Sequence, residues 1–409
     1  MTVAGRRTIV GIAALVISSC LGLPLCAAAQ SLQGRFFTAK STYLIGEPVF
    51  VIFHFTNSSD RALWVDSQFG QPCFGKENIT VVGAWRAVHE WKTALDCYGG
   101  WAGSCLGGMT ELKAGQTHSE RIFVNHYYKM DQPGLYEIRI ARKVSTYLQG
   151  SYSHPGPTIS VRADIDIRVV QGSEWELKAA FQPVLKDLKS TDGEQRWQAV
   201  QAVTELAHPF LQQTVIDISK NPTDVWAAIE GLYKLNTTKS RERLAEIVQA
   251  GESDTIRERA MRALAALGDE HYLPFYFRLA HSLKGHEQIV AIESAGLLGG
   301  SQAVPFISSF LSSQDPAVRM AAIRGLAGTT SRHALPRLIE EILDPDPGVR
   351  QIAGAALAQL THLSTADNAL ASVHNPALTF QKWFDWWLSN GRNAPIYGPT
   401  ECAEPQPLN

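Results

Sequence analysis

The chain has 409 residues, which is enough for two or three domains with complete hydrophobic cores. Hydrophobic residues make up 45% and charged residues 19%, a composition that is ordinary for a globular protein and excludes a largely disordered chain. The formal net charge is only −2, so no strongly basic surface is expected and nucleic acid is not a predicted partner.

Residues 1–29 have the features of an export signal peptide. Arg6 and Arg7 precede an apolar run, and small residues follow at Ala27–Ala29. The run is too short for a transmembrane span. We therefore expect a bacterial protein exported to the periplasm or the extracellular space. Cys20 supports a less favoured alternative, a lipid-anchored lipoprotein, because it ends a sequence that resembles a lipobox. A twin-arginine signal ranks third.

Four cysteines remain after cleavage near Ala29, an even number in a compartment that permits disulfides. Cys97 and Cys105 enclose a glycine-rich segment that could close locally, which would leave Cys73 to pair with Cys402. Pairing of Cys73 with Cys97 or Cys105 is equally allowed. The connectivity therefore stays open.

Residues 31–170 show the alternation of apolar and polar side chains that is typical of β-strands. The alternation continues from Ile159 to Val169, which predicts a half-buried antiparallel strand. Val49–Phe55 is apolar at nearly every position and is predicted to be a central strand covered on both faces. Shorter predicted strands are Ala62–Val65, Ile79–Val82, Arg121–Val124 and Leu135–Ile140. Short strands separated by turn residues predict a β-sandwich.

One motif in this region resembles the tyrosine corner of immunoglobulin-like domains. It is Asp131-Gln-Pro-Gly-Leu-Tyr136, in which the tyrosine is expected to bond back to the preceding backbone. Ile138 stands where antibody domains have a cysteine, so the bridge between sheets is not expected. The resemblance implies an immunoglobulin-like β-sandwich and carries no activity with it.

The segment 67–117 is the least regular part of the chain. It holds Trp85, Trp91, Trp101 and His89 besides three of the cysteines. Long loops on a rigid scaffold often carry function, which permits an aromatic contact surface for a partner or a sugar. Large aromatic side chains are more often buried for packing, so we favour a disulfide-braced loop.

Residues 171–375 repeat with a period of 31 residues. Asp315-Pro-Ala-Val-Arg319 recurs as Asp346-Pro-Gly-Val-Arg350. Two further columns keep the same spacing: Ile229, Ala260, Ala291, Ala322 and Ala353, and Pro274, Pro305 and Pro336. A fixed period with two helix-sized runs in each unit predicts an α-solenoid, here of about six helix pairs. Asp315 and Asp346 are expected to cap the second helices of their units.

The repeated motif is Asp-x-x-Val-Arg-x-x-Ala-x-x-x-Leu, at Asp315–Leu326 and Asp346–Leu357. It resembles HEAT repeats, in particular the short HEAT-like units first associated with phycobilisome lyases. Ser253–Leu264 matches with Ser in place of Asp, whereas the unit beginning at Glu287 keeps little of the pattern. The resemblance covers about half of the chain and implies a HEAT-like α-solenoid without specifying a function.

Arginine recurs in the motif at positions 257, 319 and 350. The row could bind anions, but Gln288 interrupts it. We favour the interpretation that each arginine braces a neighbouring turn.

A second charged column alternates in sign along the repeat. It consists of Arg262, Glu293 and Arg324, followed by Ala355. A surface of mixed charge suits a protein partner better than phosphate groups. Arg262, Glu293 and Arg324 are therefore the candidate partner-binding residues.

Residues 376–391 are predicted to form a capping helix that ends at Gly391. Its aromatic residues Trp383, Phe384, Trp386 and Trp387 are expected to form one side that covers the last repeat. The tail 392–409 is expected to be irregular.

The sequence indicates no catalytic, cofactor or metal site. His286-Glu and His89-Glu begin like zinc-protease helices but lack the second histidine. Nucleophile-elbow, phosphate-loop and dinucleotide motifs do not occur. We therefore predict a non-enzymatic scaffold for an unknown protein partner. The alternative is an enzyme, either a lyase by analogy with the repeat family or a hydrolase sited in the 67–117 loops.

Overall fold

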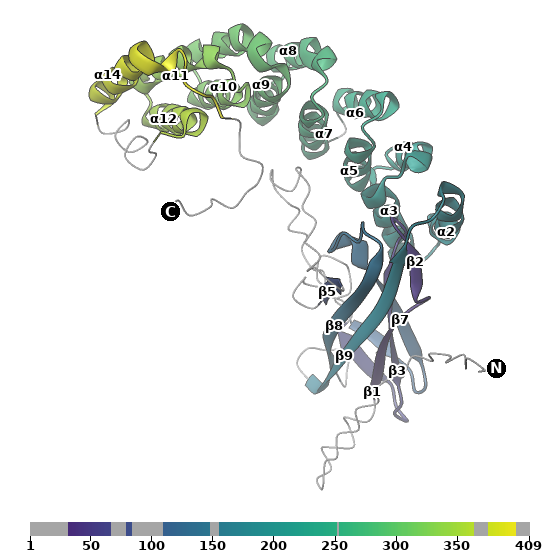
Figure 1. Ribbon diagram of the computed structural model, residues 1–409. Helices are drawn as coiled ribbons and strands as arrows, with labels where there is room; N and C mark the ends of the chain where they lie inside the picture. Colours follow the sequence, from purple (N-terminus) through teal and green to yellow (C-terminus); the bar gives the residue numbers. More distant parts are fainter. Residues whose placement is uncertain are drawn as a thin grey trace, which may run out of the picture.

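The computed structural model describes residues 32–66, 79–83, 109–147, 155–251, 253–363 and 375–397. Within these residues a β-sheet region is followed by a helical region of 12 α-helices (Figure 1). The expected signal peptide at 1–29 lies outside the described residues, as do all the cysteines discussed above. Trp85, Trp91, Trp101 and His89 also lie outside them.

The β region contains two sheets. The smaller sheet has the order β1-β3-β7 and is antiparallel throughout. The larger sheet has the order β2-β9-β8-β4-β6, with β5 also paired to β8 and β2 parallel to β9. The strands are β1 (Leu32–Thr38), β2 (Thr42–Leu44), β3 (Phe50–Asn57), β4 (Leu63–Asp66), β5 (Ile79–Gly83), β6 (Met109–Leu112), β7 (Thr117–Phe123), β8 (Gly134–Tyr147) and β9 (Pro155–Val170).

The two sheets share one hydrophobic core. Phe53 and Phe55 of β3 are fully buried in the same cluster as Ile138 of β8. Alternate residues of β3 point into this core, and the residues between them are half-buried. The prediction that this strand is covered on both faces therefore holds only in part, because one face is buried and the other is half-buried. Only its Phe50 end is packed against the helical core.

The hydrogen bond predicted for Tyr136 is present. Its hydroxyl donates to the carbonyl oxygen of Gln132 over 2.8 Å. The alternation predicted for β9 is also present, since the residues between Ile159 and Val169 switch between exposed and more buried positions.

Three strands, β1, β2 and β6, were not predicted. β2 and β6 have only three and four residues, too few to show alternation. β1 contains Gly34, which lies where the side chains of Phe53 and Val161 leave no room for a Cβ atom. β8 is longer than predicted because it continues through polar residues such as Arg142, which pairs with Glu120 of β7 over 2.6 Å.

The helical region forms six helix pairs in a curved row (Figure 1). The first helices are α2 (Glu174–Asp187), α4 (Gln212–Ile218), α6 (Thr238–Ala250), α8 (Leu273–Ser282), the second part of α9 (Gly285–Ser308) and α11 (Leu335–Glu340). The second helices are α3 (Gly193–Leu206), α5 (Val225–Leu235), α7 (Asp254–Ala266), the first part of α9, α10 (Pro316–Gly328) and α12 (Pro347–Thr361). Gly300 divides α9, because its backbone is in a non-helical conformation at φ 48° and ψ −139°.

Short 3₁₀ turns connect several elements. They are η4 (Val124–His126), η5 (Pro209–Leu211), η6 (Glu270–Tyr272), η7 (Ser309–Ser312), η8 (Arg332–Ala334) and η9 (Glu341–Leu343). In the described residues one stretch, Gly285–Ser312, is long and apolar enough to cross a membrane. It is interrupted at Gly300 and 56% of its most apolar window is buried, as in a core helix of a solenoid.

The repeated residues take the predicted roles. The carboxylate of Asp315 accepts a hydrogen bond from the backbone N–H of Ala317 over 2.8 Å, and that of Asp346 accepts one from Gly348 over 2.8 Å. Both caps satisfy donors that a helix start leaves unpaired. The column Ile229, Ala260, Ala291, Ala322 and Ala353 is fully buried. Small side chains there let neighbouring helices approach closely.

The motif arginines brace turns, as favoured from the sequence. Arg319 donates to both carboxylate oxygens of Asp344 in the next unit over 2.8 and 2.9 Å. Arg350 donates to the carbonyl oxygen of Asp344 over 2.8 Å, and Arg257 pairs with Glu287. Gln288, which interrupts the row, donates to the carbonyl oxygen of Ala280 over 2.8 Å.

The helical region ends in α14 (Pro376–Trp386), which continues as the π-helical turn η10 (Trp387–Gly391). Trp383 is buried, and Trp386 and Trp387 are half-buried against the helical core. Phe384 was expected on this side but is 40% exposed. Since successive helical residues lie about 100° apart, it points away from the side that Trp383 occupies.

The β region lies beside α2 and α3 at the start of the helical region (Figure 1). Phe123 of β7 is fully buried and belongs to the helical core. Arg121 donates to Asp187 over 2.7 Å and to Gln198 over 3.0 Å. The ring of His126 pairs with Glu205 over 2.8 Å. Side chains from both regions therefore share one packed and hydrogen-bonded junction.

Candidate partner-binding groove

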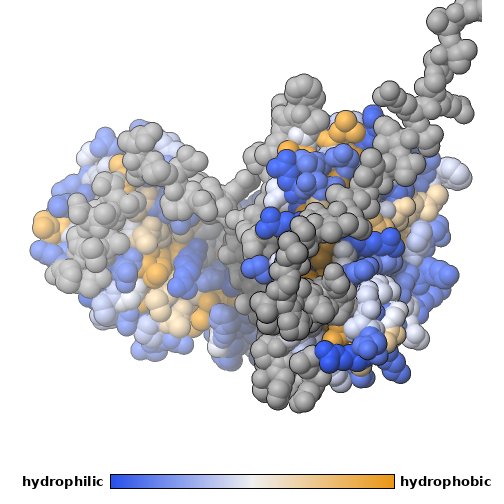
Figure 2. All heavy atoms as spheres, turned by 90° about the horizontal axis from the view of Figure 1, so that it is seen from below, coloured by the Kyte–Doolittle hydropathy of each residue, from blue (hydrophilic) through white to orange (hydrophobic). Residues whose placement is uncertain are grey.

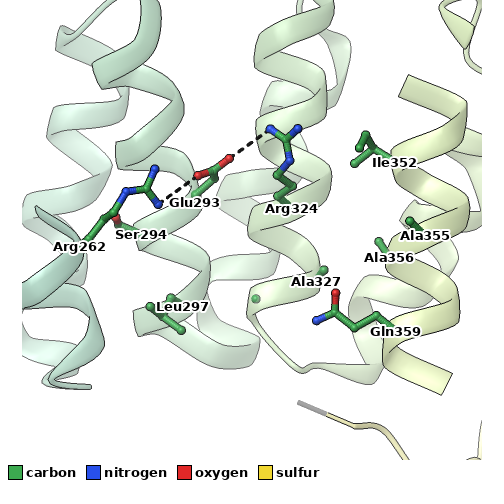
Figure 3. A pocket seen from close by; sticks show the side chains of 11 residues that line it. Arg262, Glu293, Ser294, Leu297, Arg324, Ala327, Ile352, Ala355, Ala356 and Gln359 are labelled. Atoms are coloured by element: carbon green, nitrogen blue, oxygen red, sulfur yellow. Dashed lines mark hydrogen bonds and ion pairs between the residues drawn. The ribbon is translucent and has the colours of Figure 1, made fainter. Parts of the chain in front are cut away.

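An open groove with a volume of about 390 Å³ crosses four consecutive second helices. The helices are α7, α9, α10 and α12 (Figure 3). The lining residues are Arg262, Glu293, Ser294, Leu297, Arg324, Ala327, Gly328, Ile352, Ala355, Ala356 and Gln359. All three candidate partner-binding residues thus lie in the groove.

The period of the repeat creates this arrangement. Residues 31 positions apart occupy equivalent places on successive second helices, so Arg262, Glu293, Arg324 and Ala355 form a row across them. Ala355 has the smallest side chain of the row and is exposed. Its size leaves space between α10 and α12.

The charged residues of the row are paired with one another. Glu293 accepts a hydrogen bond from Arg262 over 3.5 Å and another from Arg324 over 3.3 Å (Figure 3). Both distances are long for hydrogen bonds between nitrogen and oxygen. The side chain of Arg324 is 49% exposed, whereas that of Glu293 is 18% exposed. Both pairings are therefore loose, and Arg324 is the more exposed of the two arginines.

A further acidic residue, Glu258, lies on α7, the helix at one end of the groove. Burial raises the pKa of the Glu258 carboxyl, while the charges of His286 and Arg262 act in the opposite direction. His286 lies 3.4 Å from Glu258. His286 is the residue whose sequence context resembles the start of a zinc-protease motif. In the structure it contacts the carboxylate of Glu258 on the neighbouring helix.

The rest of the groove is largely apolar. Ala327 and Ala356 are buried, Leu297 and Ile352 are half-buried, and Gln359 supplies an amide at the far end (Figure 3). Figure 2 views the molecule from the side on which the second helices lie, and an apolar area surrounded by hydrophilic side chains is visible on the solenoid. We call the four apolar residues Leu297, Ala327, Ile352 and Ala356 the groove floor.

The floor residues were not singled out from the sequence, although Leu297 and Ala356 belong to columns that keep the spacing of the repeat. Leu297, Gly328 and Gln359 are spaced by 31 residues, as are Ser294, Gly325 and Ala356. The column that contains Ser294 follows the charged row by one position. The column that contains Leu297 follows it by four positions, about one helical turn. Apolar columns of a repeat are normally assigned to the core, so this pattern alone does not separate a buried column from a groove floor.

The groups in the groove are suited to binding. The lining offers two guanidinium groups, one carboxylate, one amide, one hydroxyl and an apolar floor. In the described residues no group of three or more His, Cys, Asp or Glu side chains is arranged to hold a metal ion. The disulfide candidates Cys73, Cys97, Cys105 and Cys402 lie outside the described residues, so their pairing stays a prediction.

The family profile for HEAT repeats matches residues 278–358, and that for the PBS lyase HEAT-like repeat matches residues 256–275. The helical region is built from HEAT-like repeats. Together the two matched ranges contain every groove residue except Gln359. A comparison with curated proteins finds no match.

Several solved structures are similar to part of this chain at low identity. The complex of CpcE and CpcF of phycocyanin lyase from Nostoc sp. PCC7120 is 19% identical and covers 36% of this chain and 99% of its own, with a TM-score of 0.31. The archaeal HEAT-like repeats protein from Thermococcus onnurineus NA1 is 15% identical and covers 48% and 89%, with a TM-score of 0.30. Human deoxyhypusine hydroxylase in complex with glycerol is 13% identical and covers 52% and 95%, with a TM-score of 0.23. At these TM-scores the likeness supports no conclusion about the fold or the activity of this chain.

Proposed function

We propose that this chain is a non-enzymatic scaffold that binds a segment of a partner protein in the groove across α7, α9, α10 and α12. The observation that carries the proposal is the combination of a row of mixed charge with an apolar floor in one open groove. Apolar floors supply affinity by removing surface from water, and charged groups at their edge fix the orientation and choice of partner.

The size of the groove fits side chains of a partner rather than a large cofactor. Its volume of about 390 Å³ lies near the lower end of the range of ligand sites, roughly 300–1,000 Å³. The long hydrogen bonds of Glu293 also favour binding, because a partner could replace them at little cost.

The β region is proposed to be an immunoglobulin-like sandwich that supports the solenoid. Two sheets with a shared core and the hydrogen bond from Tyr136 to Gln132 support this proposal. Such modules host many unrelated functions, so the binding role is assigned to the groove and not to the sandwich.

The proposed location is outside the cytoplasm, in the periplasm or the extracellular space. The support is the composition of residues 1–29, with the lipoprotein form through Cys20 as the alternative. After expression with residues 1–29 present, N-terminal sequencing should find a mature chain that begins near Gln30. A full-length chain recovered from the cytoplasmic fraction would contradict export.

The binding role is tested by filling the groove. Ala355→Trp places a large side chain at an exposed position of α12, and Ala179→Trp makes the same change at an exposed position of α2. Native protein and both variants are immobilised and incubated with cell-envelope extract, and bound proteins are quantified by mass spectrometry. Each captured protein is then purified and its Kd measured.

We expect a partner whose affinity for Ala355→Trp falls at least about tenfold, or ~1.4 kcal/mol, and stays unchanged for Ala179→Trp. Circular dichroism and thermal unfolding establish that both variants are folded. If every captured protein binds all three forms equally, the groove is not the binding site.

A further inference from the structure

We infer that the segment bound in the groove carries a carboxylate two or three residues away from an apolar side chain. The carboxylate would bind Arg324, and the apolar side chain would cover the groove floor between α10 and α12. This inference rests on the proposed function and defines the chemistry of the partner.

Arg324 has the capacity to bind a carboxylate. A guanidinium group has five N–H donors, and within the described chain the hydrogen bond of this one goes to Glu293 over 3.3 Å. The side chain is 49% exposed at the edge of the groove. A partner carboxylate could therefore form a shorter, bidentate pair with Arg324, which is the preferred geometry for these two groups.

The distribution of charge places the anion at Arg324 and not at Arg262. Arg262 lies between Glu293 on α9 and Glu258 on its own helix, so two carboxylates are close to it. On its other side Arg324 faces α12, whose lining residues Ile352, Ala355 and Gln359 carry no charge. The positive charge in excess is therefore located at the α10 side of the groove.

The same geometry argues for a single carboxylate rather than a phosphate chain. Glu293 stands in the middle of the row, between the two guanidinium groups. The negative charge of Glu293 would repel a ligand that carries several adjacent negative charges. A peptide with one acidic side chain can avoid Glu293 and still reach Arg324.

The spacing of the helices predicts the spacing in the partner. Packed helix axes lie about 8–10 Å apart, so Arg324 on α10 and the floor residues of α12 are separated by roughly that distance. An extended chain advances about 3.3 Å per residue. The acidic and the apolar residue of the segment should therefore be two or three positions apart.

The test uses a phage library of random twelve-residue peptides. The library is selected on the native protein, and Ala355→Trp identifies peptides that depend on the groove. Affinities of these peptides are then measured for Arg324→Glu and for the neutral variant Arg324→Gln. Arg337→Glu serves as the matched control, because Arg337 is an exposed arginine on α11 with a side chain that is 54% exposed.

Peptides that depend on the groove should contain Asp or Glu two or three positions from Leu, Ile, Val or Phe. Their affinity should fall at least about tenfold with Arg324→Gln and stay unchanged with Arg337→Glu. Replacing the acidic residue of the peptide by Lys should restore binding to Arg324→Glu.

Two other results have different meanings. Peptides that are lost with Ala355→Trp but bind Arg324→Gln undiminished would overturn the carboxylate inference and leave the proposed function intact. A selection in which no peptide distinguishes native protein from Ala355→Trp would count against the proposed function itself.

Discussion

Arg319 and Asp344 join two consecutive helical units through hydrogen bonds of 2.8 and 2.9 Å. Both residues are buried, with 8% and 9% of their surface exposed. Burial acts to raise the pKa of Asp344, but hydrogen bonds from Arg319 and from the backbone of Asp346 bring it below its usual value. Asp344 is therefore held as a carboxylate in the turn between α11 and α12, the two helices of the last unit.

Glu341, in the same turn, is affected in the opposite direction. Burial and the nearby charge of Asp344 raise the pKa of Glu341 to about 7. In the unfolded chain this carboxyl titrates near 4.5. Between these two values the folded protein binds more protons than the unfolded protein does, so this group makes the fold less stable as the pH rises from about 4.5 to about 7.

Glu341→Gln should remove this pH dependence. The melting temperature of the variant should be close to that of the native protein at pH 5 and higher than that of the native protein at pH 8. Differential scanning calorimetry across this range measures the difference, and Glu340→Gln is the control at an exposed neighbouring site. A difference that is the same at both pH values would show that Glu341 is not protonated in the folded state.

The caps and the bracing arginines could be predicted from the sequence because they act within a repeat or between adjacent repeats. The titration of Glu341 could not, since it depends on burial in the assembled turn. Glu287 occupies a position that is apolar in the other units, and its pairing with Arg257 explains why the repeat tolerates a carboxylate there.

The helices α9 and α10 contact each other through glycine residues. A Cβ atom at Gly296 would collide with the carbonyl group of Gly325, and one at Gly325 would press on the backbone of Ile292. Backbone atoms cannot move aside as a flexible side chain can. This contact therefore sets the distance between the two helices that carry Glu293 and Arg324.

Gly296→Ala should force α9 and α10 apart. We expect a loss of about 1–3 kcal/mol in the free energy of unfolding, the usual cost of an overpacked core. Gly193→Ala is the matched control, because no atom lies within 4 Å of its added Cβ at the first turn of α3. Its stability should be unchanged or up to about 1 kcal/mol higher. Urea unfolding of both variants measures the effect, and equal stabilities would refute the close contact.

The helices were easier to predict than the strands. The 31-residue period reveals second helices directly, and it also brings Arg262, Glu293 and Arg324 into one row. β1, β2 and β6 carry no comparable signal, because their positions depend on pairing with distant strands such as β3 and β9. The groove floor was not predicted for a related reason: whether an apolar column is covered depends on the curvature of the whole row.

The junction between the β region and the solenoid connects residues far apart in the sequence. The partners Arg121 and Asp187 are 66 positions apart, and Gly46 and His208, which are joined over 2.7 Å, are 162 positions apart. No local pattern predicts such pairs. The sequence indicated two regions but did not indicate that side chains of both regions pack together at a junction, where Phe123 of β7 joins the helical core.

Phe123→Ala should weaken both regions together. Removing a fully buried phenylalanine typically costs about 3–5 kcal/mol, and here the side chain belongs to the helical core although it is on β7. Hydrogen exchange should become faster in β7 and also in α3. Phe37→Ala, at a half-buried site on β1, is the control and should leave α3 unchanged. If the hydrogen-exchange rates of α3 are unaltered in Phe123→Ala, the β region and the helical region are not coupled.

The packed and hydrogen-bonded junction fixes the separation between the β region and the groove. A ligand that is long enough to touch both would bind its second contact intramolecularly, at an effective concentration set by the connecting segment. Two weak contacts would then add up to strong binding only for ligands whose own contact points match this separation. The junction would thus let the protein discriminate between ligands by length as well as by local chemistry.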